Sequence, residues 1–267
     1  KIAALDFMSN FFVHFPSEKI NVENNLLFEP IQSPYAKRIS GVLTMYERIS
    51  KAVSDSMKNN FFPVVLSGDH SNAGGTIAGI KMAKPKSKLG VIWIDAHADL
   101  RNAYEGFDQS HASIMYNVLD RCQHLEKLVQ IGIRDISATE VELSKSHPKI
   151  KTYYDWDLKT ENFEGKNWSE QVQEIIGSLP QNVYISFDID GLKPELCPHT
   201  GTPVAGGFEL EQISYLLFQL VATGRRIIGF DLNEVAPGEN NDWDANVGAR
   251  ALWQLVCACE KSRRNHA

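Results

Sequence analysis

The sequence predicts an α/β fold with a central, mainly parallel sheet that helices cover on both faces. Three observations lead to this fold class. Short apolar runs rich in β-branched residues recur along the chain, and stretches with helical spacing lie between most of them. Acidic residues and histidines gather where the apolar runs end. Because open α/β sheets bind ligands at the carboxyl ends of their strands, we expect the functional residues along one edge of the sheet.

The predicted strands share a continuous apolar character, which is typical of strands buried on both faces. In chain order they are Ile2–Leu5, Pro63–Leu66, Leu89–Ile94, Leu128–Ile133, Lys151–Tyr154, Val183–Phe187 and Arg226–Phe230. The predicted helices repeat apolar residues at three- and four-residue intervals. They are Tyr35–Lys58, Asn72–Met82, Ser169–Ile176, Glu209–Val221 and Ala245–Cys259. The polar segment Asp155–Lys166 is predicted to be an exposed loop.

Length and composition narrow the class of protein. No repeat or linker divides the 267 residues, so we expect one domain over 1–267. A net charge of −6 provides no basic footprint for nucleic acid. No apolar run approaches the roughly 20 residues that span a bilayer, and no signal peptide is visible. The cysteines at 122, 197, 257 and 259 lack paired CxxC spacing, which indicates reduced thiols. We expect a cytoplasmic protein with no membrane partner.

Two strand ends carry carboxylates at alternate positions. The run IDAHAD at 94–99 places Asp95, His97 and Asp99 two residues apart, so that in an extended chain their side chains share a face. The run SFDID at 186–190 repeats the pattern with Asp188 and Asp190. Two carboxylates that are this close repel each other unless a cation lies between them. Both strand ends therefore favour a bound cation.

A third strand end adds His70, in SGDHS at 67–71. The combined set has two imidazoles and four carboxylates, whose charge would balance two divalent cations about 3.5–4 Å apart. Oxygen ligands with some imidazole suit Mn²⁺, and Zn²⁺, Ni²⁺ and Co²⁺ are alternatives. A single Asp-x-Asp is usually a turn or a helix cap, and a single His is usually structural. Three such pieces, each at a predicted strand end, predict a two-metal centre.

Five motifs, in this order, resemble those of the ureohydrolase family of arginases and agmatinases. They are SGDHS at 67–71, IDAHAD at 94–99, SFDID at 186–190, TGTPVAGG at 200–207 and DLNEVAPG at 231–238. The resemblance extends from about Pro63 onward. It implies a three-layer αβα, arginase-like fold with a binuclear manganese centre. It also implies that a metal-bridging hydroxide cleaves a C–N bond of a linear guanidino or amidino compound, and that the chain assembles into trimers or hexamers.

The resemblance also implies a role for each site residue. One metal would be held by His70, Asp95, Asp99 and Asp188, and the other by His97, Asp95, Asp188 and Asp190, with Asp95 and Asp188 as bridges. His111 stands where the family carries a proton-shuttling histidine, and the ordinary pKa of an imidazole suits that task. Its alternative role is to cap the following helix. Glu234 matches the carboxylate that binds guanidinium, a pairing that charge-assisted hydrogen bonds favour.

The chain departs from the family pattern at a few positions. Ser67-Gly68 replaces the usual Gly-Gly, which should leave His70 in place. His199 stands where a small residue is usual. It could narrow the mouth of the site or contact substrate, but we expect it to be merely exposed. Lys1–Pro34 shows little of the family's glycine-rich opening, so nothing is expected of it.

The segment between the IDAHAD motif and His111 is expected to choose the substrate. It lacks the Thr-x-Ser-x-Asn pattern with which arginases hold L-arginine and looks more like the agmatinase branch. Glu105 or Asp108 could receive the far ammonium of agmatine, whereas Arg101 could receive the carboxylate of a guanidino acid or of formimidoyl-glutamate. Thr202, in TGTPVAGG, is also expected to contact substrate. A solvated loop is the alternative interpretation of these residues.

We therefore expect hydrolysis of agmatine to urea and putrescine first, then of guanidinobutyrate, L-arginine and formimidoyl-glutamate in that order. A member of another class, a catalytically silent metal-binding scaffold, should have lost a ligand. Here all six ligand positions are present, together with His111 and Glu234. A deacetylase on a related fold would need a pair of histidines before Asp95, which the sequence lacks.

Overall fold

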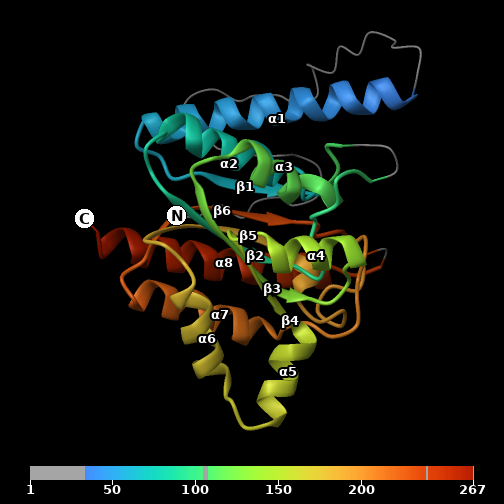
Figure 1. Ribbon diagram of the computed structural model, residues 1–267, viewed down its shortest axis with the longest axis vertical. Coiled ribbons are helices and arrows are strands. Elements are labelled where there is room, and N and C mark those ends of the chain that lie inside the picture. Colours follow the sequence, from blue (N-terminus) through green and yellow to red (C-terminus); the bar gives the residue numbers. More distant parts are fainter. Residues whose placement is uncertain (1–33, 105–107, 239, 267) are drawn as a thin grey trace.

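A parallel sheet organises the described part of the chain, which in this computed structural model comprises residues 34–104, 108–238 and 240–266. Its spatial order is β1-β6-β5-β2-β3-β4 (Figure 1). The strands are β1 (Val64–Ser67), β2 (Leu89–Ile94), β3 (Leu125–Ile133), β4 (Ile150–Tyr154), β5 (Asn182–Asp188) and β6 (Arg226–Asn233). All neighbouring strands pair in parallel, so their carboxyl ends lie along one edge.

Helices cover both faces of this sheet (Figure 1). They are α1 (Pro34–Lys58), α2 (Asn72–Ala83), α3 (Ile114–Arg121), α4 (Ala138–Ser146), α5 (Asp155–Phe163), α6 (Trp168–Gly177), α7 (Leu210–Ala222) and α8 (Trp243–Arg264). Two short 3-10 helices, η2 (His111–Ser113) and η3 (Ile189–Gly191), lie among them. Helices α1, α2 and α3 pack on one face of the sheet, and α6, α7 and α8 pack on the other. The predicted fold class is confirmed.

Alternation along β2 shows how one strand serves two cores. Val91 and Trp93 face a core that α1, α2 and α3 complete. Ile92 and Ile94 face the opposite core, to which α5, α6, α7 and α8 contribute. Because all four side chains are fully buried, the strand has no polar position until its carboxyl end. The first polar residue, Asp95, therefore marks the point where the chain leaves the sheet.

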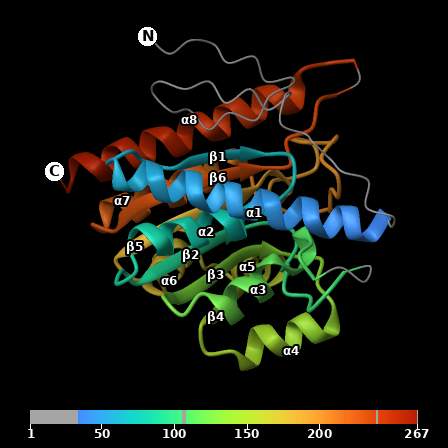
Figure 2. The same ribbon diagram turned by 90° about the horizontal axis from the view of Figure 1, so that it is seen from above.

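Helix α1 lies against the outer side of α2 (Figure 2). Glycines on α2 allow this close approach. A Cβ on Gly79 would lie 2.6 Å from the carbonyl oxygen of Ser50 and 2.7 Å from Cβ of Val53. Any side chain at this position would force the two helices apart. In the described ranges, no helix is long and apolar enough to cross a membrane.

The prediction for Asp155–Lys166 is wrong, because much of this polar segment forms α5. Although its composition is polar, several of its residues favour a helix. Asp155 and Asp157 lie in the first turn, where the helix dipole favours negative charge. Lys159 lies 2.7 Å from the Asp155 carboxylate one turn away, and Leu158 is buried in a core. The other strands and helices are confirmed with shifted ends, while Ile2–Leu5 lies outside the described residues.

Candidate metal centre

Four neighbouring strands bring the predicted ligands to one edge of the sheet. Asp95 follows β2, Asp188 ends β5, and β1 leads through a turn to His70 at the start of α2. Glu234 follows β6, which lies between β1 and β5. Residues that are more than a hundred positions apart in the sequence therefore meet because their strands are parallel neighbours.

His70 lies at the centre of one group. Its Nδ1 is 3.0 Å from Oδ2 of Asp95, 3.1 Å from Oδ2 of Asp188 and 3.9 Å from Oδ2 of Asp99. The imidazole stacks on the indole of Trp93, with ring centroids 3.9 Å apart. One face of the ring is thus fixed by an apolar side chain, and its edge points at three carboxylates.

His97 forms a second group beside the first. Its Nδ1 lies 3.0 Å from Oδ2 of Asp190 and 3.4 Å from Oδ1 of Asp95. Asp95 therefore faces both imidazoles, one with each carboxylate oxygen. On its outer side, Nε2 of His97 lies 3.7 Å from the exposed carboxylate of Asp135.

Three sets of side chains are close enough to hold metal ions. In each set the ligand atoms lie within 4.8 Å of one another: His70, Asp95 and Asp99; Asp95, His97 and Asp190; Asp188, Asp190 and Glu234. Asp95 and Asp190 each belong to two sets, as a bridging carboxylate would, whereas the predicted bridge Asp188 belongs to one. Asp188 joins the groups by geometry, since it approaches His70 and shares a set with Asp190. The donors are carboxylate oxygens and imidazole nitrogens, which fit Mn²⁺ chemically.

Two residues of the site adopt backbone conformations that L-residues rarely use. Asp99 has φ +52° and Glu234 has φ +62°. Such conformations cost on the order of 1–3 kcal/mol unless the surroundings enforce them. At Glu234 the backbone N–H donates to the Ser67 carbonyl at 3.0 Å, and its carbonyl accepts from Thr200 Oγ1 at 2.9 Å. These bonds turn the carboxylate back toward the cluster, where its Oε1 accepts from the backbone N–H of His70 at 3.3 Å.

The electrostatics show that the cluster lacks positive charge. Burial and then the charge of Asp190 raise the pKa of Asp188 well above its usual range. Burial opposes charge on His97, but hydrogen bonds to Asp190 and Asp95 outweigh it and raise the pKa of His97 to about 11. Burial, together with Asp95 and Asp190, raises the pKa of Glu234 to about 7. Bound cations would supply the missing charge and displace the histidine protons.

A second layer of polar side chains orients His70. Its Nε2 lies 2.8 Å from Oγ of Ser186, which in turn donates to Oδ1 of Asp231 at 2.7 Å. Asp231 is fully buried and also accepts from Tyr184 and, at 2.6 Å, from Asn233. Because Ser186 uses its proton on Asp231, it accepts from Nε2–H. This leaves Nδ1 of His70 as the ligand atom.

Arg134 binds the backbone at the predicted ligand Asp190. Its guanidinium donates to the carbonyl of Asp190 at 2.7 Å, to that of Leu192 at 3.1 Å and to that of Val204 at 2.8 Å. The sequence analysis did not identify this residue, nor Ser186 and Asp231. The last two carry a recognisable signal, because polar residues at alternate positions in apolar strands point to one face.

His111 lies in the segment after Asp99. Tyr104 connects two predicted residues there: its ring centroid is 5.6 Å from that of His111 and 5.2 Å from Cζ of Arg101. Arg101 also lies 3.6 Å from the buried carboxylate of Glu140. His111 belongs to none of the three ligand sets. Glu140 could not be predicted as a partner of Arg101, because only the fold brings the two together.

The other residues that the sequence suggested as substrate contacts lie in different surroundings. Thr202 Oγ1 lies 3.4 Å from Oδ2 of Asp190, so this side chain is at the centre. Glu105 lies outside the described residues. Asp108 is exposed. Its carbonyl accepts from Asn117 Nδ2 at 2.6 Å. His199 is about a third exposed, but it pairs with the buried Asp244 at 2.8 Å and so is more than a surface residue.

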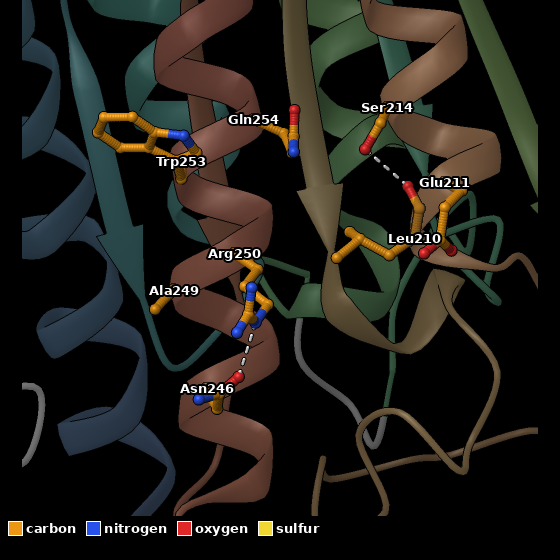
Figure 3. A pocket seen from close by; sticks show the side chains of 8 residues that line it. All are labelled: Leu210, Glu211, Ser214, Asn246, Ala249, Arg250, Trp253 and Gln254. Atoms are coloured by element: carbon orange, nitrogen blue, oxygen red, sulfur yellow. Dashed lines mark hydrogen bonds between the residues drawn. The ribbon is translucent and has the colours of Figure 1, made fainter.

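A separate open groove of about 780 Å³ lies between α7 and α8 (Figure 3). Its wall includes Trp253 and Arg250 on α8 and Glu211 on α7. Arg250 is held by Asn246 at 2.9 Å. None of the predicted site residues lines this groove.

Comparisons with known proteins give matches over most of the chain. The model of the arginase family matches residues 11–258. Hepatic arginase of Aquarana catesbeiana is 32% identical over 251 residues, which cover 86% of this chain and 75% of the relative. Arginase-1 of Rattus norvegicus is 29% identical over 271 residues, with 92% and 80% covered.

Solved structures show the same fold. The arginase from Bacillus caldovelox has a TM-score of 0.73 and 26% identity, covering 85% of this chain and 80% of that one. The agmatine ureohydrolase of Thermoplasma volcanium has a TM-score of 0.68 and 26% identity, covering 85% and 72%. The chain therefore belongs to the arginase family, whose members are hydrolases that act on amidino C–N bonds.

Proposed function

We propose that this hydrolase cleaves agmatine to urea and putrescine at a two-manganese centre. One observation carries the proposal: the carboxylate of Glu234 lies within 4.8 Å of ligand atoms of Asp188 and Asp190. A guanidinium group bound by Glu234 would thus be presented to the cluster. Bound at this cluster, two Mn²⁺ ions would act as Lewis acids and lower the pKa of a water molecule toward 7.

The protein's own residues would orient the substrate and move protons. Glu234 would pair with the planar guanidinium through charge-assisted hydrogen bonds. Cations bound beside it would offset the neighbouring carboxylates that raise its pKa to about 7, and so favour the ionised form. His111 would donate a proton to the amine that leaves. Its place beside Tyr104 keeps it at the segment where the substrate tail would lie.

The charges around the centre favour a cationic tail. Asp135 is 62% exposed and, among the described residues, its side chain pairs only with His97. Arg101, the candidate receptor for a carboxylate, already faces Glu140 at 3.6 Å. Asp135 thus offers an exposed negative charge, whereas the positive charge of Arg101 is partly neutralised by Glu140. This arrangement supports the ammonium of agmatine over the carboxylate of guanidinobutyrate, L-arginine or formimidoyl-glutamate.

The test is an assay of protein reconstituted with Mn²⁺ against these four compounds, with urea or formamide as the measured product. We expect the highest kcat/KM for agmatine. Turnover of none of them would overturn the proposed function, and a clear preference for L-arginine would overturn the proposed substrate. By family resemblance we also propose a trimer or hexamer, which sedimentation would test.

A further inference from the structure

A buried carboxylate holds His199 at two points. Nδ1 of His199 lies 2.8 Å from Oδ1 of Asp244, and its backbone N–H donates to Oδ2 at 2.9 Å. Asp244 is fully buried in the first turn of α8, where the helix dipole favours its charge. Since a carboxylate only accepts, Nδ1 carries the proton. The His199–Asp244 pair therefore joins the segment around residue 199 to α8.

Contacts beside this pair connect it to Glu234 and to the segment that follows Glu234. The residue after His199 is Thr200, which is buried and donates to the Glu234 carbonyl at 2.9 Å. Further along, a Cβ on Gly238 would lie only 3.1 Å from Cε1 of His199. The imidazole is thus packed against the end of the segment that Glu234 begins.

Helix α8 closes the same segment from its other side. A Cβ on Gly248 would lie 2.9 Å from both methyl groups of Val235. Glu234 itself has φ +62°, a conformation that depends on its surroundings. Asp244 and Gly248 lie one turn apart on α8, so the helix that anchors His199 also packs against the residue that follows Glu234.

We propose that His199 is a positioning residue, which acts through Asp244 and Thr200 to hold Glu234 in place for the guanidinium end of the substrate. This role rests on the proposed function of Glu234. It depends on the Nδ1 side of the imidazole, because that atom meets Asp244. It also assigns a role to a side chain that the sequence predicts to be merely exposed.

The test compares three substitutions of His199. In His199→Asn the amide nitrogen takes the place of Nδ1, in His199→Gln it takes the place of Nε2, and His199→Ala has neither. We expect kcat/KM for agmatine to fall by about tenfold to a hundredfold in the Ala and Gln variants, mostly through KM. The inhibition constant of free guanidinium ion should rise by the same factor. The Asn variant should stay near wild type, with metal content unchanged in all three.

Either of two results would overturn the proposal. One is an Ala variant with wild-type KM and guanidinium inhibition. The other is retention of activity by Gln with loss by Asn, which would assign the role to Nε2. If the wild-type protein hydrolyses no guanidino compound, the proposed function fails. Hydrogen exchange of the Glu234, Val235 and Ala236 amides then tests separately whether His199 holds Glu234 in place. Faster exchange in Ala and Gln but not in Asn would support the hold on Glu234, and unchanged exchange would overturn it.

Discussion

The side chains of the metal cluster and those of the segment after Asp99 are held in different ways. His70, Asp95 and Asp188 are at most 2% exposed, and each meets several polar partners. Arg101, in contrast, has a side chain that is 41% exposed. Tyr104 meets its neighbours through ring contacts. The cluster's side chains are thus fixed by strands and hydrogen bonds, whereas the side chains of Arg101 and Tyr104 are held by one ion pair and by ring contacts.

This difference predicts that metal binding and substrate choice can be altered separately in this protein. Parallel strands fix where the ligands lie, whatever the substrate. Arg101, Tyr104 and His111, in the segment after Asp99, lie outside the strands and can vary without moving one, as binding loops on rigid scaffolds generally do. Substitutions in the cluster should therefore alter metal content and every activity. Substitutions in the segment should alter only rate or preference.

The largest effect is expected from Asp188→Asn. The substitution removes a charge that faces both His70 and Asp190, so metal content should fall together with all urea release. The loss should exceed the 10- to 100-fold that removal of an outer-shell partner typically costs. Metal analysis and kcat measure it, with Asp157→Asn on the surface of α5 as the control. Two metals per chain in Asp188→Asn would contradict the proposed bridge.

His111→Ala should separate the two regions most clearly. Because His111 belongs to no ligand set, the variant should keep its metal, while kcat falls by about 10²- to 10⁴-fold through loss of a proton donor. The comparison needs metal content, kcat and the pH–rate profile of both proteins. If the profile and kcat are unchanged, His111 has no proton-transfer role.

Ser186→Ala tests the outer support of the cluster. The variant loses the oxygen that accepts from His70 Nε2–H, so Mn²⁺ affinity should fall by about 10- to 100-fold. The matched control is Ser144→Ala, which loses a similar hydroxyl contact to Tyr154, a residue that belongs to none of the ligand sets. Each should cost about 1 kcal/mol of stability. Equal Mn²⁺ affinities in the two variants would refute the orienting role of Ser186.

Arg101→Ala is expected to shift substrate preference slightly. Exposed ion pairs contribute little, so the ratio of kcat/KM for agmatine over guanidinobutyrate should rise about twofold to fivefold, with unchanged metal content. Arg264→Ala, which removes a distant exposed charge, controls for net charge. A selective loss of agmatine turnover would mean that Arg101 serves the agmatine tail.

The smallest effect concerns His124, a half-buried histidine outside the site. Both ring nitrogens of His124 lack hydrogen-bond partners in the described residues, and burial, with Lys81 and Lys149, lowers its pKa from 6.5 to about 4. The unfolded chain therefore binds this proton more readily between those values. The free energy of unfolding should fall as pH drops through that range and stay level above it. Denaturant midpoints should show a shallower pH slope for His124→Gln than for wild type, and identical slopes would contradict the assignment.

The ligand set could be predicted from the sequence because period-two alternation and strand ends are local signals. Asp95 and Asp188 follow uninterrupted apolar strands, and parallel pairing then brings them together. The segment Asp155–Phe163 could not be recognised as α5, because its single buried leucine gives no apolar periodicity. Its stabilisation comes from tertiary burial and from an ion pair.

Contacts between residues that are far apart in the sequence could not be predicted either. Asp244 and His199 are 45 positions apart, and only the packing of α8 against the Glu234 segment makes them partners. The pair of Arg101 with Glu140 likewise depends on the packing of α4 beside the segment after Asp99. Local patterns report periodicity and turn chemistry, whereas these pairs follow from the completed fold.

Manganese titration of metal-free protein tests the central claim most directly. Two ions about 3.5–4 Å apart would share carboxylates and couple their electron spins. We expect two Mn²⁺ per chain by elemental analysis, a spin-coupled electron paramagnetic resonance spectrum and urea release from agmatine that rises with the coupled signal. Binding of a single uncoupled Mn²⁺, or of none, by the folded protein would contradict it.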